Sequence, residues 1–242
     1  MKGGLLYMKI INKPTATVEQ VYAWLETKNP HPLAKAMIPL FFDKATKEGI
    51  DPIVVICQAM KETGYFKYKG VLRPNFCNTC GLKGNKGGGD LDPDAHTRFE
   101  YWEDGIAAHI DHIALYAGAS SYPRYSDICH SEDKNKDTLK SRGITLDPRH
   151  FTYLHGKCPN VEDLSGNWAP GKDYGQEIVR LCAEIQNTVV KPIEDKCDHS
   201  KYEDEIISLK EDIDELQKEI VSKNQIVEKY NNLKTCLQEI VK

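Results

Sequence analysis

Apolar residues recur at helical spacing through most of this chain, and this pattern favours an all-α fold. In the second apolar segment, for example, Leu33, Met37 and Leu40 fall on one side of a helix. The segments cover about residues 18–25, 33–45, 52–63, 103–117 and 173–190. Residues 67–99 lack this period and are rich in glycine, so we expect a small loop-rich lobe between the third and fourth helices.

A different pattern follows Pro192, which ends the last of these helices. Residues 193–242 place Ile or Val at heptad position a and Leu at position d, which favours a parallel two-stranded coiled coil. We therefore predict a catalytic domain at residues 8–192 and a homodimerising tail at residues 193–242. The alternative is an amphipathic helix that folds back on the domain, because Lys223, Tyr230 and Lys234 interrupt the seam. The seam residues are Ile206, Leu209, Ile213, Leu216, Ile220, Val227, Leu237 and Val241.

The charge distribution and the termini exclude some classes of function. Residues 194–242 hold 8 Lys against 13 Asp and Glu, whereas the rest of the chain is nearly neutral. No basic patch stands out, which argues against a nucleic-acid partner. The sequence contains no run of 18 apolar residues that would span a membrane and no signal-peptide pattern. We therefore expect a protein that stays in the cytoplasm until it is released, with Met8 as its natural start.

The eight cysteines are expected to be mostly reduced, because the domain is too large to need disulfides and no secretion signal is seen. Cys57 and Cys182 lie inside apolar helical patterns, where a thiol packs as a small apolar side chain.

A zinc site is the alternative use of the cysteines. Cys77 and Cys80 could be combined with His96, or with His109 and His112. However, a single Cys-x2-Cys pair lacks the second pair that zinc-finger spacing requires. We expect no metal and no cofactor.

The third apolar segment ends in a carboxylate. Asp51 is a suitable N-cap and Pro52 a suitable first residue for this helix. Val55, Ala59 and Glu62 then lie at i, i+4 and i+7, on one face. An acid on an apolar face loses hydration, which raises its pKa, and a carboxyl group that is protonated near neutral pH can donate a proton to a leaving oxygen. The alternative is a helix-end glutamate whose carboxylate simply reaches solvent.

Four motifs in order place this glutamate in a family context. They are Glu62-Thr63-Gly64-Tyr65-Phe66, Asn-Thr-Cys-Gly-Leu-Lys-Gly at 78–84, Phe-Glu-Tyr-Trp-Glu-Asp-Gly at 99–105 and Trp-Ala-Pro-Gly-Lys-Asp-Tyr at 168–174. Over residues 15 to 190 the chain resembles the bacterial glucosaminidases of glycoside hydrolase family 73, which cut peptidoglycan. The resemblance implies a lysozyme-like catalytic domain in which Glu62 is the general acid.

The identity of the second catalytic group is harder to predict from the sequence than that of the general acid. The resemblance implies a Glu on a β-hairpin after the Gly-x-Lys-Gly segment, but residues 85–96 of this chain contain no Glu. Asp90, Asp92 and Asp94 are the nearest carboxylates, and Glu100 precedes a helix. Asp90 follows three glycines that let the backbone approach a ligand, so we predict that Asp90 is the second catalytic residue. Alternatively, the acetamido group of the substrate attacks its own anomeric carbon, and only Glu62 and a polarising partner are needed.

Substrate contacts are predicted around Glu62. Aromatic rings stack on sugar rings, and Trp168 and Tyr174 match the motif near the end of the resembled domain. Asn78 and Lys83 can hydrogen-bond acetamido or lactyl groups. The predicted substrate-binding residues are Tyr65, Asn78, Lys83, His96, His150, Trp168 and Tyr174.

Together these features predict an endo-β-N-acetylglucosaminidase that cleaves the β-1,4 bond between N-acetylglucosamine and N-acetylmuramic acid in peptidoglycan. A phage lysis enzyme fits the lack of a signal peptide, and a particle-associated hydrolase fits it as well. A lytic transglycosylase or a muramidase that uses the same Glu62 is the alternative among enzymes. A non-catalytic phage-tail or wall-binding module is the alternative outside them.

Overall fold

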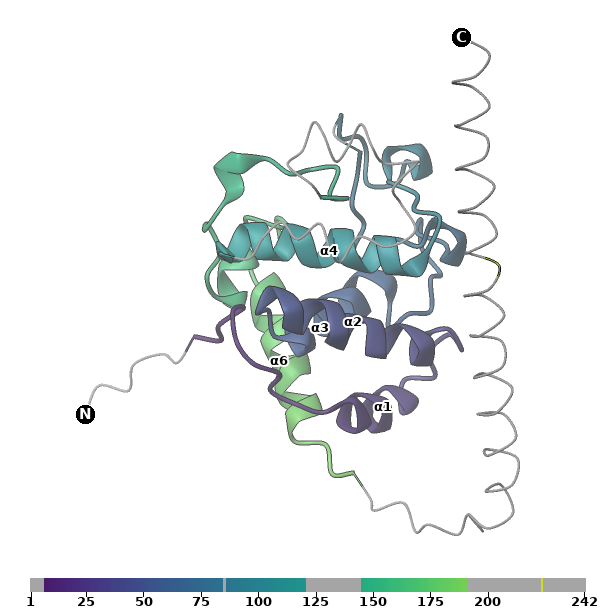
Figure 1. Ribbon diagram of the computed structural model, residues 1–242, viewed down its shortest axis with the longest axis vertical. Helices are drawn as coiled ribbons and strands as arrows, with labels where there is room; N and C mark the ends of the chain where they lie inside the picture. Colours follow the sequence, from purple (N-terminus) through teal and green to yellow (C-terminus); the bar gives the residue numbers. More distant parts are fainter. Residues whose placement is uncertain (1–6, 85, 121–144, 191–222, 224–242) are drawn as a thin grey trace, which may run out of the picture. The chain divides into compact units, whose positions relative to one another are not determined.

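The domain is built from α-helices joined by loops and short 3-10 helices (Figure 1). A computed structural model describes residues 7–84, 86–120, 145–190 and 223. The α-helices are α1 (Val18–Glu26), α2 (Ala34–Glu48), α3 (Pro52–Thr63), α4 (Trp102–Ala117) and α6 (Tyr174–Gln186). The 3-10 helices are η1 (Pro74–Phe76), η2 (Pro93–Ala95), η4 (Thr152–Leu154) and η5 (Val161–Leu164). These described residues contain isolated β-bridges but no strand, which confirms the predicted all-α class.

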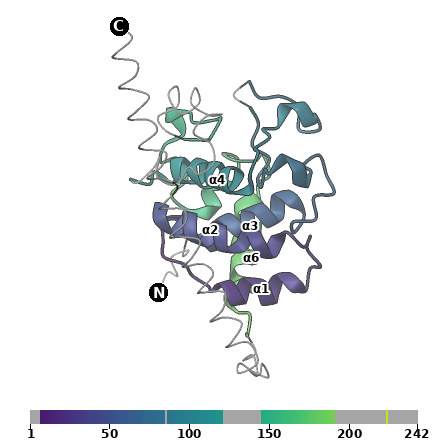
Figure 2. The ribbon, with the colours of Figure 1, turned by 45° about the vertical axis from the view of Figure 1, so that its right-hand side comes forward.

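The helix α3 lies at the centre of the domain (Figures 1 and 2). It packs against α2, α4 and α6, while α1 packs against α2 and α6. Every residue of α3 except Lys61 and Glu62 is buried. A helix covered on several sides by apolar contacts is fixed firmly in place. Its last turn is therefore the part of α3 that can present side chains to a ligand.

Both ends of α3 follow the signals in its sequence. The Asp51 carboxylate accepts a hydrogen bond from the backbone N–H of Ile53 (3.0 Å) and another from the Thr15 hydroxyl (2.6 Å). Pro52 is the first helical residue. Gly64 ends the helix with φ 62°, a left-handed conformation that glycine adopts at little cost. These caps hold the turn that carries Glu62.

The predicted loop-rich lobe is seen at residues 64–101, with η1 and η2 inside it. The lobe packs closely on α4. Gly105 of α4 is so near to it that a Cβ atom there would stand only 1.7 Å from the Cys77 carbonyl oxygen. A β-bridge between Lys83 and His96 joins its two sides. The lobe brings Gly81 to the end of α3, where a Cβ atom would lie 3.9 Å from Glu62 Oε2.

The chain divides into two units, residues 1–190 and 191–242. Of the second unit the structure describes only Lys223. The predicted coiled coil at residues 193–242 therefore lies outside the described residues and stays a prediction. Among the helices that the structure does describe, each is too short or too polar to cross a bilayer.

Candidate active site

A pocket of about 980 Å³ lies at the end of α3. It is lined by the end of α3, by the lobe, by α4 and by the loops around Arg149 and Trp168. Its polar and titratable lining residues include Glu62, Lys83, Asp90, His96, His112 and Arg149. A concave site with several convergent polar groups is the usual form of an active site.

Glu62 lies in this pocket and is only partly exposed. Burial raises the pKa of its carboxyl group, because the charged form loses hydration. Hydrogen bonds from the side chains of Tyr174 and Trp168 partly offset this rise, since they favour the charged form. The net effect is a raised pKa, which favours the protonated acid. The sequence predicted this property for Glu62, and the packing of α3 supplies its cause.

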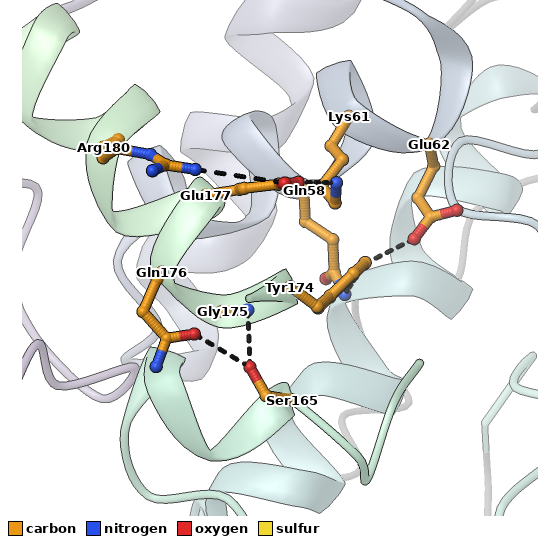
Figure 3. A network of polar contacts seen from close by, with 9 residues as sticks. All are labelled: Gln58, Lys61, Glu62, Ser165, Tyr174, Gly175, Gln176, Glu177 and Arg180. Atoms are coloured by element: carbon orange, nitrogen blue, oxygen red, sulfur yellow. Dashed lines mark hydrogen bonds and ion pairs between the residues drawn. The ribbon is translucent and has the colours of Figure 1, made fainter. Parts of the chain in front are cut away.

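A chain of hydrogen bonds leads from Glu62 into the core (Figure 3). The Tyr174 hydroxyl donates to Glu62 Oε1 and accepts from the Gln58 amide N–H at 3.0 Å. The Gln58 carbonyl oxygen lies 3.0 Å from His109 Nε2. The other ring nitrogen of His109 lies 2.9 Å from the Thr79 hydroxyl. Tyr174, Gln58 and His109 each have a hydrogen-bond partner on both sides, as buried polar groups require.

The His109 ring is neutral in this network of hydrogen bonds. It is fully buried, and burial lowers its pKa to about 3 because a charged imidazole would lose its hydration. A neutral ring carries one proton. Since Gln58 offers its carbonyl oxygen, that proton sits on Nε2, and Nδ1 accepts from Thr79. In this network Thr79 therefore donates to His109, His109 to Gln58, Gln58 to Tyr174 and Tyr174 to Glu62, so every donor points toward Glu62.

Tyr174 is positioned by the start of α6. It is the first residue of that helix, and Ser165 Oγ accepts a hydrogen bond from the backbone N–H of the next residue, Gly175, at 2.9 Å (Figure 3). Next to it, Lys61 of α3 forms an ion pair with Glu177 of α6. These contacts join α3 to α6 and keep the phenol beside the carboxylate.

Trp168 forms the aromatic side of the pocket. Its ring centroid lies 5.1 Å from that of His112, 5.7 Å from Tyr116 and 6.0 Å from His109. Trp168 is partly exposed and lines the pocket. An aromatic ring held in this way offers a rigid apolar surface on which a sugar ring can stack.

His112 and Asp147 form a second polar pair that reasoning from the sequence missed. His112 Nδ1 lies 2.6 Å from Asp147 Oδ2, and the backbone N–H of Arg149 donates to Asp147 Oδ1 at 2.8 Å. Asp147 is fully buried, whereas His112 and Arg149 line the pocket. The Asp-Pro-Arg-His run at 147–150 was the available signal, but its last residue, His150, was chosen as the site residue.

The lobe side of the pocket holds Lys83, Asp90 and His96 together. Lys83 Nζ lies 2.5 Å from Asp90 Oδ1 and donates to the Gly88 carbonyl oxygen at 2.7 Å. The hydrogen bond from Lys83 lowers the pKa of Asp90, whose side chain is 91% exposed. His96 Nδ1 lies 2.9 Å from the carbonyl oxygen of Asp92. This side is therefore polar and charged.

Besides Tyr174, which lies beside Glu62, three predicted substrate-binding residues are not among those that line the pocket. Asn78 is fully buried, and its amide donates to the carbonyl oxygens of Leu82 (2.8 Å) and Thr97 (2.9 Å), so it supports the lobe from inside. The Tyr65 ring packs on Trp24, with centroids 5.9 Å apart. His150 is partly buried next to the pocket residue Arg149.

Metal chemistry finds no support in the part of the chain that the structure describes. No group of three or more His, Cys, Asp or Glu side chains there could hold a metal ion. The thiols of Cys77 and Cys80 are free and buried. Burial raises the pKa of both thiols, which disfavours the thiolate that zinc requires.

A partly buried carboxyl group with a raised pKa, placed in a pocket, can act as the general acid of glycoside hydrolysis. The comparison with protein families agrees. The model described as "Glucosaminidase: Mannosyl-glycoprotein endo-beta-N-acetylglucosaminidase" matches residues 38–215. The chain belongs to this glucosaminidase family.

One curated relative is an "Uncharacterized protein" of Borreliella burgdorferi, 26% identical over 148 residues. The match covers 60% of this chain and 59% of the relative, so the chain spans about three fifths of that protein's length. No solved structure matches the chain.

Proposed function

We propose that the protein is an endo-β-N-acetylglucosaminidase that hydrolyses the β-1,4 bond on the reducing side of N-acetylglucosamine in bacterial peptidoglycan. The observation that carries this proposal is the Glu62 carboxyl group, which lies in the pocket with a raised pKa and accepts a hydrogen bond from Tyr174. Membership of the glucosaminidase family supports the coarser part of this proposal, a hydrolase of the glucosaminidase class that acts on peptidoglycan.

Glu62 acts as the general acid in this proposal. Its proton passes to the oxygen that bridges the two sugars while the bond from that oxygen to the anomeric carbon breaks. The Tyr174 hydroxyl then stabilises the carboxylate that remains, because its proton already points at Oε1. The substrate contacts that we propose from the pocket lining are Lys83, His96 and Trp168, together with Tyr174 beside Glu62.

Analysis of the new sugar end tests the proposal. Purified peptidoglycan is digested, the products are reduced with borohydride, and the reduced sugars are identified by mass spectrometry. We expect reduced glucosamine ends. Reduced muramic acid would instead identify a muramidase, and 1,6-anhydromuramic ends would identify a lytic transglycosylase, which also relies on a single helix-end glutamate.

A role in phage lysis is the second part of the proposal. We propose that the enzyme accumulates in the cytoplasm and cuts the wall once a membrane hole releases it, and that the tail at 193–242 makes it a dimer. The heptad pattern supports the dimer, and two linked domains would gain avidity for a polymeric wall.

Two measurements address this role. Light scattering of the full chain at micromolar concentration is expected to give twice the chain mass, and a monomer mass would contradict the dimer. Cells that express the protein are expected to stay intact until the inner membrane is permeabilised, and lysis without that treatment would contradict the proposed release.

A further inference from the structure

The pocket contains a hydrogen-bonded histidine and aspartate besides Glu62. His112 of α4 is only 4% exposed yet lines the pocket, and its Nδ1 lies 2.6 Å from Asp147 Oδ2. A carboxylate next to Nδ1 holds the ring proton there, which leaves the lone pair of Nε2 free to accept another proton. Asp147 is itself fixed, because the backbone N–H of Arg149 donates to its other oxygen at 2.8 Å.

Trp168 connects this pair to the acid. The His112 and Trp168 rings meet edge to face with centroids 5.1 Å apart, and Trp168 lines the same pocket as Glu62 and lowers the pKa of its carboxyl group. Glu62 comes from α3 and His112 from α4, so the two groups reach the same indole from different helices. Because Glu62, His112 and Trp168 all line the pocket, a sugar bound against Trp168 would lie near both an acid and a base.

The charged and titratable groups around His112 come from several elements. Asp147 contacts its ring directly, and the ring of Tyr116, one turn further along α4, lies 5.1 Å away. His109 lies one turn earlier on α4 and is neutral, and Arg149 lines the same pocket. The direct charged partner of the imidazole among these groups is thus the Asp147 carboxylate.

Asp90 is a weaker candidate for the same task. Its side chain is 91% exposed and is held by Lys83 Nζ at 2.5 Å. A carboxylate that is hydrated and paired with a lysine binds a proton weakly, so it is a poor base. It also lies across the pocket in the lobe, where it fits contacts with substrate hydroxyl and amide groups.

We propose that His112, positioned by Asp147, is the general base that activates the attacking water in this enzyme. The inference rests on the proposed function and adds the second catalytic group to it. His112 Nε2 takes a proton from water as the water oxygen bonds to the anomeric carbon. At the same time the bond to the bridging oxygen breaks, and that oxygen takes the proton of Glu62. Release of the His112 proton to solvent and reprotonation of Glu62 complete the cycle.

This mechanism has a stereochemical consequence. Water activated on the face opposite the leaving group inverts the anomeric carbon, so a β-linked substrate gives an α-configured new end. Nucleophilic attack by a carboxylate such as Asp90, or by the acetamido group of the substrate, would retain the β configuration.

The first test uses the wild-type protein. Proton NMR of a soluble glycan digest, recorded before the new ends mutarotate, is expected to show the α anomer first. A β anomer as the first product would overturn the assignment of His112. Because the chemical identity of the reduced end is measured separately, this failure would leave the proposed bond specificity standing.

The second test compares His112→Gln, Asp147→Asn and Asp90→Asn. We expect His112→Gln to lower kcat by about 10²–10⁴-fold with little change in KM, and to remove the acid limb of the kcat profile against pH. Asp147→Asn should lower kcat with little change in KM, because Asp147 acts only through His112, whereas Asp90→Asn should mainly raise KM, because Asp90 lies where it can contact substrate. An unchanged acid limb in His112→Gln would contradict the proposal, as would a loss of kcat in Asp90→Asn that is larger than the loss in His112→Gln. Melting temperatures of the variants check that each one is folded.

Discussion

The Tyr174 hydroxyl donates a hydrogen bond to Glu62 while it accepts one from Gln58 at 3.0 Å. This arrangement leaves the phenol proton one orientation, because the amide N–H of Gln58 occupies the other side of the oxygen. Gln58 is in turn oriented by His109, whose ring is neutral. The core of the domain thus fixes the direction in which a proton is offered to the Glu62 carboxylate, and the same donor limits how far burial raises the pKa of Glu62.

Tyr174→Phe should raise the pKa of Glu62 further, because it removes a hydrogen bond that lowers this pKa. The alkaline limb of the activity profile, where Glu62 loses its proton, should therefore move to higher pH. Removing the hydroxyl also leaves the buried Gln58 N–H without its acceptor, which should cost about 1–3 kcal/mol in the free energy of unfolding. Activity against pH and urea unfolding measure the two effects.

Tyr65→Phe is the matched control for this change, because Tyr65 is not among the residues that line the pocket. Its pH profile should coincide with that of the wild type. An alkaline limb that moves to lower pH in Tyr174→Phe would show that the phenol does not act as a donor to Glu62.

His109 should make the domain less stable in acid. The folded pKa of about 3 lies below the ordinary histidine value of 6.5, so between these values the unfolded chain binds a proton that the folded chain does not. The contribution of His109 to stability is therefore present above about pH 6.5 and is lost as the pH falls toward about 3, by up to about 1.4 kcal/mol per pH unit.

His109→Gln removes this titration while keeping a side chain that can donate to Gln58 and accept from Thr79. Urea unfolding of both proteins at several pH values should give a flatter dependence for the variant. Identical slopes in the two proteins would contradict a neutral buried His109.

Gly105→Ala should break the contact between the lobe and α4 or unfold the whole domain. The new Cβ atom would stand 1.7 Å from the Cys77 carbonyl oxygen, so the backbone would have to move. We expect a loss of at least about 3 kcal/mol, at the upper end of overpacking effects. Gly84→Ala is the control, since no atom lies within 4 Å of its Cβ position. Thermal unfolding of both variants measures the difference, and equal melting temperatures would contradict the close packing.

Chelation should leave the enzyme active. The described residues bring no metal-binding cluster together, and burial keeps the thiols of Cys77 and Cys80 protonated. Protein dialysed against EDTA should therefore keep its activity within about twofold, because general acid catalysis needs no metal. A loss of activity that zinc restores would show that a metal site exists.

The ends of α3 could be predicted from the sequence because their causes are local. Asp51 caps the helix, Pro52 begins it and Gly64 ends it, and each signal lies within a residue or two of the boundary. The burial of Glu62 also followed from helical periodicity. What surrounds Glu62 did not follow, because Tyr174 is 112 residues away in the chain and no spacing rule connects them.

Two interpretations of site residues show the same limit. Asn78 was expected to contact substrate, but its amide is used by the backbone of the lobe, a need that becomes visible only once the loop is folded. His112 was considered only as a zinc ligand, and its partner Asp147 lies 35 residues further along the chain. Polar pairs that form between distant segments are invisible to pattern analysis of one sequence.

Glu62 is proposed to supply the proton for cleavage, and Glu62→Gln removes that proton. The change keeps the shape and an acceptor for Tyr174 but cannot donate an acidic proton. Wild type and variant are incubated with purified peptidoglycan, and new reducing ends are counted after borohydride reduction. We expect reduced glucosamine from the wild type and a rate at least about 10²-fold lower from a folded Glu62→Gln. Release of glucosamine ends at an unchanged rate by the variant would show that Glu62 is not the general acid.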